Sequence, residues 1–221
     1  MPTLPYPLIL ASRSPRRREL LAEAGYEFQV LAAREPAECG RCSRESPPEF
    51  VARLAWQKAV DVASRLPELE RGPGTARQLA DAAPRLILAC DTVAEWGGQI
   101  IGKPIDEQHA GEILRTLSGR EHHVYSGLCL WRYPGGWPRV EVAVSTLRME
   151  PLSEAQLAEY LASGLWEGKA GAFGYQDRLG WLHLVAGSES NVVGLPLELL
   201  ARMMDELLAV DTAAAQQQAQ Q

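Results

Sequence analysis

The stretch Leu8-Ile-Leu-Ala-Ser-Arg-Ser-Pro-Arg-Arg-Arg-Glu-Leu-Leu21 decides how the chain begins to fold. It opens with a short apolar run that ends abruptly, which predicts a buried strand. Ser14 is a suitable helix N-cap, and Pro15 suits the first helical position because a missing N–H costs nothing there. The stretch therefore predicts a strand, a tight turn and a helix over about 15–24.

The first turn of this expected helix is crowded with positive charge. Arg16, Arg17 and Arg18 fill it, and Arg13 lies just before it. A helix N-terminus carries about half a positive charge and favours acidic groups. Cations at that end indicate that an anion binds among them, since free backbone N–H groups and guanidinium groups together form a phosphate site. The alternative is a solvated basic turn that binds nothing.

Length and composition predict one domain, over residues 1–211, that can bury a sizeable core. The Pro-, Gly-, Arg- and Ala-rich residues 67–84 are interpreted as a surface insertion, with a short helix at 76–82 as an option within it. The last long helix is expected to end at about Val210, and the Ala- and Gln-rich tail 212–221 is expected to be disordered.

Charge and hydropathy exclude several classes of protein. The net charge of −6 argues against a nucleic-acid partner, which normally meets a broad basic face. No apolar stretch is long enough to span a membrane, and the first residues lack the pattern of a signal peptide. We therefore expect a cytoplasmic protein. Cys39 and Cys42 form a C-x-x-C without a second pair, so incidental loop cysteines are favoured over a zinc or redox site.

Further charged residues stand at positions that suit ligand binding. The apolar run 85–90 ends in Asp91 and Thr92, and ligands of open α/β sheets bind beyond the carboxyl ends of strands. Lys58 lies on a helix that a capping box at Ser46 opens, near the edge of its apolar face. Lys103 stands in a stiff Gly-Lys-Pro turn.

A glycine-rich segment, 164–180, contains Lys169, Gln176, Asp177 and Arg178. Glycine can signal that the backbone approaches a ligand closely, or only a mobile loop. The arginine cluster and the lysines Lys58, Lys103 and Lys169, together with the acids Asp91 and Glu35 or Glu38, suit phosphoanhydride cleavage. In that chemistry cations hold the polyphosphate while carboxylates hold a divalent ion and activate water. Scattered surface ion pairs are the alternative.

Several motifs together resemble the Maf family of nucleoside triphosphate pyrophosphatases. The resemblance follows the family order from about residue 8 to 205. It rests on these segments: Leu10-Ala-Ser-Arg-Ser-Pro-Arg-Arg-Arg-Glu-Leu-Leu21, Ala89-Cys-Asp-Thr-Val93, Gly102-Lys-Pro104, Leu117-Ser-Gly-Arg120, Val124-Tyr-Ser-Gly127, Lys169-Ala-Gly-Ala-Phe-Gly-Tyr-Gln176 and Gly187-Ser-Glu-Ser-Asn-Val-Val-Gly-Leu-Pro196. The resemblance implies an α/β fold of the inosine-triphosphatase-like kind, with a long central mixed sheet and two lobes around a cleft.

The resemblance also implies metal-dependent hydrolysis of a nucleoside triphosphate to the monophosphate and pyrophosphate. By position, Asp91 matches the general base, which also binds metal, while Lys58 and Lys103 match the family's catalytic lysines. The phosphate-binding turn is matched by Ser12, Arg16 and Arg17. The expected cofactor is a divalent cation, Mg²⁺, Mn²⁺ or Co²⁺.

One departure from the family pattern concerns the metal. The family usually has an acidic pair soon after the second strand, and this chain has Arg34-Glu-Pro-Ala-Glu38-Cys39 there, with a shifted length. We favour Glu38 over Glu35 as the second metal ligand. The resemblance assigns no role to the cysteine pair in this loop.

The resemblance also bears on the nucleotide and the assembly. One branch of the family, acting on dTTP and UTP, has Asp-Thr after the central strand and a glutamine in the glycine-rich segment. This chain looks like that branch, so Arg16, Thr92 and Gln176 are the candidates for base specificity. Two alternative hypotheses remain. The chain could be a pyrophosphatase acting on 7-methyl-GTP or on a broad range of noncanonical nucleotides, or it could be a nucleotide-binding regulator of cell division. A homodimer and a house-cleaning role in removing modified nucleotides are expected.

Overall fold

The computed structural model describes residues 4–34, 45–70 and 84–218. Within these ranges, seven strands form one mixed sheet in the order β2-β1-β3-β5-β6-β7, with β4 paired to the end of β3. β1 runs parallel to both β2 and β3, while β3, β5, β6 and β7 follow one another antiparallel. The strands are β1 Leu8–Leu10, β2 Phe28–Val30, β3 Arg85–Trp96, β4 Gln99–Ile101, β5 Glu121–Tyr133, β6 Arg139–Met149 and β7 Leu182–Ala186. The long central mixed sheet of the expected α/β fold is therefore confirmed.

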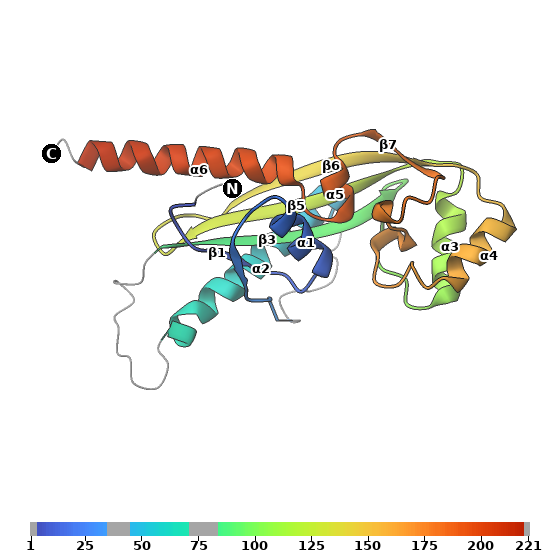
Figure 1. The fold of residues 1–221 in the computed structure, drawn as a ribbon, viewed down its shortest axis with the longest axis horizontal. Coiled ribbons are helices and arrows are strands. Elements are labelled where there is room, and N and C mark those ends of the chain that lie inside the picture. Colours follow the sequence, from blue (N-terminus) through green and yellow to red (C-terminus); the bar gives the residue numbers. More distant parts are fainter. Residues whose placement is uncertain (1–3, 35–44, 71–83, 219–221) are drawn as a thin grey trace.

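Helices divide the molecule into two lobes. Figure 1 shows α1, α2 and α6 around one half of the long strands, and α3 and α4 at their far end. The helices are α1 Pro15–Glu23, α2 Pro47–Glu70, α3 Glu107–Leu117, α4 Glu154–Ala162, α5 Glu189–Val193 and α6 Leu197–Gln218, with short 3₁₀ turns η3 Ala170–Ala172 and η4 Tyr175–Asp177. Among the parts of the chain that the structure describes, no helix has the length and apolar character needed to cross a membrane.

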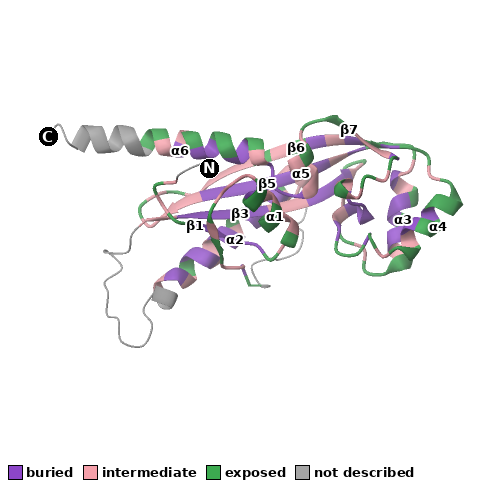
Figure 2. Cartoon of the chain, in the orientation of Figure 1, coloured by how far each residue is buried: buried purple, intermediate pink, exposed green. Residues whose placement is uncertain are grey.

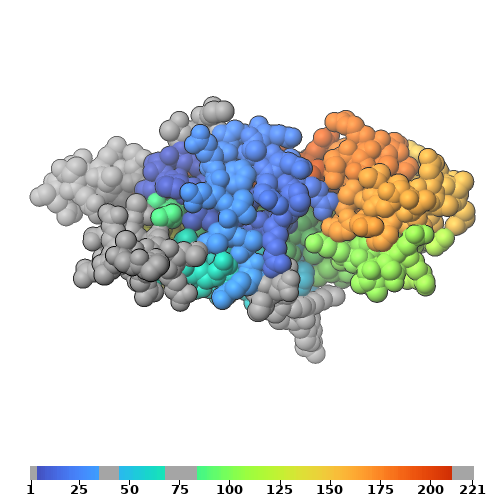
Figure 3. Space-filling model, turned by 60° about the horizontal axis from the view of Figure 1, so that its bottom comes forward, coloured from blue at the N-terminus to red at the C-terminus, as the bar shows by residue number. Residues whose placement is uncertain are grey.

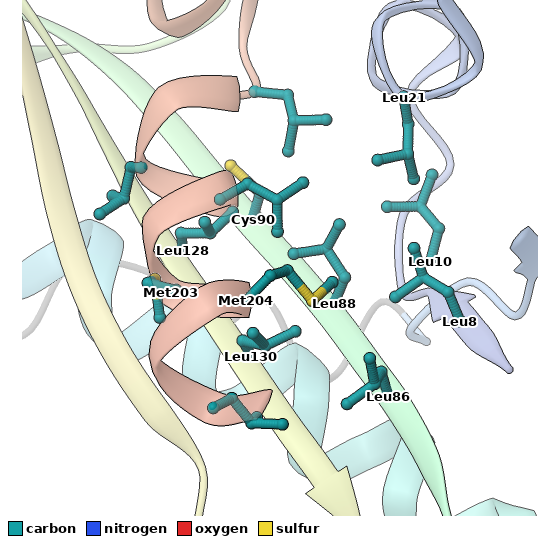
Figure 4. Close-up of a cluster of buried hydrophobic side chains, with 14 residues drawn as sticks. Leu8, Leu10, Leu21, Leu86, Leu88, Cys90, Leu128, Leu130, Met203 and Met204 are labelled. Atoms are coloured by element: carbon teal, nitrogen blue, oxygen red, sulfur yellow. The ribbon is translucent and has the colours of Figure 1, made fainter. Parts of the chain in front are cut away.

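The core of the first lobe has one layer on each face of β3. Leu86, Leu88 and Cys90 pack toward α6, where they meet Met203 and Met204 (Figure 4). Because side chains alternate along a strand, the residues between them face the opposite way and pack against α2, in a layer that contains Ile87 and Ala89. A strand that is buried on both faces reads as a continuous apolar run, as this one does.

A third core layer holds the second lobe together. Its buried residues come from α3, α4, the ends of the long strands and the segment 166–181, and include Leu114, Leu117, Leu157, Leu147 and Met149. Most buried positions lie along the long strands, and many of the exposed residues lie on loops and on the outer sides of helices (Figure 2). The rigid sheet therefore continues from one lobe into the other and fixes the groups that lie along it.

Two expected boundaries need correction. α2 continues through Pro67 to Glu70, so the first residues of the predicted insertion are helical; the rest of the insertion, with the optional helix at 76–82, lies outside the described residues. α6 extends to Gln218, so both its predicted end at about Val210 and the predicted disorder of residues 212–218 are wrong. The physical reason is that the Ala- and Gln-rich sequence has no helix breaker and a good helix propensity.

Candidate active site

A cleft of about 640 Å³ lies between the two lobes. Its walls are the turn after β1, the first turns of α2, the middle of β3, the turn after β4 and the glycine-rich segment. In Figure 3 the N-terminal residues (blue) lie beside the orange residues of the second lobe. The lining includes these residues predicted from the sequence: Ser12, Arg16, Arg17, Lys58, Asp91, Thr92, Lys103 and Gln176. The fold thus brings together candidates that lie far apart in the sequence.

Lys58 on α2 and Asp91 on β3 form a largely buried ion pair in the wall of the cleft. Lys58 Nζ donates to Asp91 Oδ1 over 2.6 Å, and the two side chains are only 7% and 14% exposed. The sequence placed Asp91 at the end of a strand over 85–90, whereas β3 continues to Trp96, so Asp91 projects into the cleft from the middle of the strand. Such a pair leaves a costly uncompensated charge when one partner is removed.

Gly127 explains how α2 reaches this position. It lies directly opposite Asp91 in the β3–β5 register. A Cβ at Gly127 would lie 2.7 Å from the backbone nitrogen of Ala52 and closer still to the carbonyl oxygen of Val51. The glycine therefore lets the helix backbone rest on the strand, and Lys58 is carried to Asp91 on the same helix.

Arg17 is fixed by three contacts at the floor of the cleft. Its Nε donates to the carbonyl of Gly194 over 2.7 Å, and its Nη atoms donate to Ser12 Oγ over 3.3 Å and to Thr92 Oγ1 over 3.0 Å. Thr92 Oγ1 also lies 2.8 Å from Ser126 Oγ. The hydroxyl of Thr92 therefore contacts protein groups and helps to hold the guanidinium of Arg17.

Arg16 and Lys103 reach the cleft from opposite lobes. Arg16 Nη2 donates to the carbonyl of Gly168 over 3.1 Å, which links α1 to the glycine-rich segment. Burial and the neighbouring charge of Arg17 lower the pKa of Arg16, and the charge of Asp177 acts in the opposite direction. Lys103 is exposed and forms no ion pair with any residue that the structure describes. Its ammonium group is thus available to an anion.

Sequence reasoning gave no role to Asp177. Its carboxylate pairs with Lys169 Nζ, and both side chains are about nine-tenths buried, at 10% and 11% exposure. Asp177 directly follows Gln176, and this position at the end of the glycine-rich motif is the sequence feature that could have indicated a role for Asp177.

Of the two carboxylates expected to bind the metal, only Asp91 lies within the described residues. Asp91 is the only acid among the cleft-lining residues in these ranges, and no three His, Cys, Asp or Glu residues there cluster as a metal site. Glu35 and Glu38 lie outside the described residues. Mg²⁺ is commonly bound by one or two carboxylates together with substrate phosphates, so Asp91 in a phosphate-binding cleft fits such an ion.

The two cysteines within the described ranges are buried in the sheet. Cys39 and Cys42 lie outside the described ranges. Cys90 and Cys129 are buried free thiols on opposite faces of the sheet. Burial raises the pKa of the Cys129 thiol to about 12, so it remains protonated and unreactive.

Comparison with known proteins agrees with this geometry. A family model described as Maf-like protein matches residues 7–207. The dTTP/UTP pyrophosphatase of Rhodopirellula baltica is 50% identical over 202 residues, which cover 91% of this chain and 82% of that protein. Proteins of the same name from Hyphomonas neptunium and Sphingopyxis alaskensis are 38% and 40% identical, each covering 86% of this chain and 90% of the relative. The chain belongs to the Maf family.

Proposed function

We propose that the protein hydrolyses dTTP and UTP to the nucleoside monophosphate and pyrophosphate, with Asp91 activating the attacking water. The observation that carries the proposal is the Lys58–Asp91 pair, at 2.6 Å, in a cleft whose other charged lining residues, within the described ranges, are cationic. The relatives named dTTP/UTP pyrophosphatase support the choice of substrate.

The triphosphate binds along the cationic wall. Arg16 and the anchored Arg17 lie at the start of α1, where backbone N–H groups and the helix dipole add to the attraction for an anion. Lys103 approaches from the turn after β4 and holds the far end of the triphosphate. These charges stabilise the negative charge that develops on the leaving pyrophosphate.

In the chemical step, water attacks the α-phosphorus and the bond from the α-phosphorus to the bridging oxygen of pyrophosphate breaks. Asp91 accepts the proton of the water through its carboxylate, which Lys58 orients by its hydrogen bond to Oδ1. Asp91, with Glu38 as a second proposed ligand, would hold a divalent cation, which when bound would neutralise phosphate charge and lower the pKa of water. Hydrolysis in ¹⁸O-labelled water should place the label in the monophosphate.

Base selectivity is proposed to depend on Arg16, Thr92 and Gln176. The Gln176 amide can both donate and accept, which matches a pyrimidine carbonyl and its N3–H. Thr92 contributes through Arg17, since its hydroxyl accepts from that guanidinium. Thr92→Gln or Gln176→Glu should change the preference for UTP over 7-methyl-GTP, and an unchanged ratio in both variants would remove these residues from the selectivity argument.

We also propose that the protein is a cytoplasmic homodimer. The apolar side chains of Val142 and Val144 are exposed on one face of β6, which supports an association surface. Light scattering after size-exclusion chromatography at micromolar concentration measures the assembly. A monomeric mass across that range would remove the dimer from the proposal.

The experiment that tests the activity is pyrophosphate release from dTTP, UTP, CTP, 7-methyl-GTP, dITP and ATP, with Mg²⁺ or Mn²⁺ and with chelator. We expect preference for dTTP and UTP, loss of activity with chelator and loss in Asp91→Ala. Activity on 7-methyl-GTP alone would overturn the selectivity. No release from any triphosphate would favour a nucleotide-binding regulator instead.

A further inference from the structure

The glycine-rich segment is closed by an ion pair that the catalytic proposal does not use. Lys169 lies just before η3 and Asp177 at the end of η4, eight residues later, and their charged groups meet in a nearly buried position. Gln176, the proposed base-reading residue, directly precedes Asp177 and lines the cleft. The ion pair therefore joins the two ends of the loop that presents Gln176.

The loop between these ends packs tightly on the pair. A Cβ added at Gly174 would lie 2.9 Å from the carboxyl carbon of Asp177 and also too close to Lys169 Nζ. The carboxylate is anchored a second time, since the Tyr160 hydroxyl on α4 lies 3.5 Å from Asp177 Oδ2. Burial raises the pKa of Tyr160, so it remains protonated and able to donate. Asp177 thus connects the loop to α4 of the second lobe.

The same loop contacts the phosphate-binding side of the cleft. Arg16, on α1 of the first lobe, donates to the carbonyl of Gly168, the residue before Lys169. The negative charge of Asp177 also raises the pKa of Arg16, against the lowering by burial and by Arg17. One end of this loop therefore contacts Arg16, which is proposed to bind phosphate, and the other end carries Gln176, which is proposed to recognise the base.

We propose that the Lys169–Asp177 pair is the positioning element for base selectivity: it holds Gln176 at a fixed place relative to Arg16, so that the amide meets the base when the triphosphate is bound. The inference rests on the proposed function, because it names how that site selects its base. Lys169 also lines the cleft. If Lys169 were instead a phosphate ligand that Asp177 restrains, neutralising Asp177 would strengthen binding of every triphosphate equally.

The test compares wild type with Asp177→Asn on UTP and CTP, since the two bases differ at the edge that an amide reads. We expect kcat to stay within about threefold, KM for UTP to rise about tenfold and KM for CTP to change less, so that the UTP/CTP ratio of kcat/KM falls. Asp177→Glu, which keeps the charge, should recover part of the ratio. The control is Glu154→Gln, which breaks the exposed Arg115–Glu154 pair of the same lobe and should leave the ratio unchanged.

A double-mutant cycle separates positioning from a general effect on the lobe. If Asp177 acts through Gln176, then Asp177→Asn should cause no further loss of the ratio in a Gln176→Ala background. Additive effects, an unchanged ratio in Asp177→Asn, or tighter binding of both nucleotides would each overturn the inference. Lys169→Arg keeps the charge but not the geometry, and provides the same readout if Asp177→Asn fails to fold.

Calorimetric binding of the non-hydrolysable analogue α,β-methylene-UTP keeps this test independent of turnover. Absence of pyrophosphate release by wild type would defeat the proposed function. If Asp177→Asn bound the UTP analogue more weakly than wild type but kept its affinity for the corresponding CTP analogue, the positioning role would still be supported. If wild type and Asp177→Asn bound the UTP analogue with equal affinity, the positioning role would be defeated.

Discussion

The contact between α2 and β5 makes Gly127→Ala an informative perturbation. Gly127 lies opposite Asp91 in the sheet, and the backbone of α2 rests on it at Val51 and Ala52. An added Cβ would lie 2.7 Å from the Ala52 nitrogen, closer than such atoms approach in proteins. Because the opposing atoms are backbone, no side-chain rotation relieves the overlap, and the helix has to move away from the strand.

The expected magnitudes follow from this overlap. Overpacking of a tight contact costs about 1–3 kcal/mol of stability. At about 2–4 °C per kcal/mol for a chain of this size, the melting temperature should fall by about 2–12 °C. Movement of α2 also separates Lys58 Nζ from Asp91 Oδ1, now 2.6 Å apart. A misplacement of about 1 Å can lower turnover about 100-fold, so kcat should fall much more than stability alone predicts.

The assays are thermal unfolding and steady-state pyrophosphate release, with Gly102→Ala as the stability control. Gly102 has no positive φ, and a Cβ there would meet no atom within 4 Å. Its melting temperature should therefore match that of wild type. If Gly127→Ala kept both the wild-type melting temperature and the wild-type kcat, the idea that close packing of α2 positions Lys58 would be refuted.

Three further predictions concern single side chains. Burial lowers the pKa of His122 from 6.5 to about 4, so its contribution to stability is complete above pH 6.5 and is lost as the pH falls toward 4. At 1.36 kcal/mol per pH unit, His122→Leu should reduce the stability loss between pH 7 and pH 5 by about 2 kcal/mol in urea unfolding, and an unchanged loss would contradict this. Lys58→Met leaves Asp91 without its ion-pair partner, so kcat for UTP should fall about 100-fold in steady-state turnover, and a kcat near that of wild type would contradict this. Thr92→Val removes an acceptor of Arg17, so KM for UTP should rise about fivefold with little change in kcat.

Much of the fold was predictable because the deciding patterns are local. The apolar run of β3 is buried on both faces, and the Ser-Pro turn after β1 starts α1 at Pro15 as expected. The helix expected to open after Ser46 likewise forms as α2, which begins at Pro47. The helical extension to Gln218 was missed because composition alone does not separate a disordered Ala- and Gln-rich tail from a continuing helix.

Placement of the candidate site depended more on motif resemblance than on local pattern. Lys58 is ordinary in a helix until α2 is known to pack across β3, and the glycine that permits this packing, Gly127, is far away in the sequence. Asp177 looked like a loop acid because its partner, Lys169, meets it only when the segment folds back on itself. Glu38 stays a prediction from the sequence.

Asp91 is proposed to activate the water while the cations bind the triphosphate. The direct measurement compares Asp91→Asn with wild type in two assays: UTP turnover with Mg²⁺, and affinity for α,β-methylene-UTP without metal. We predict that turnover falls by about 1,000-fold or more while affinity stays within about threefold. Turnover near that of wild type in Asp91→Asn would contradict the claim.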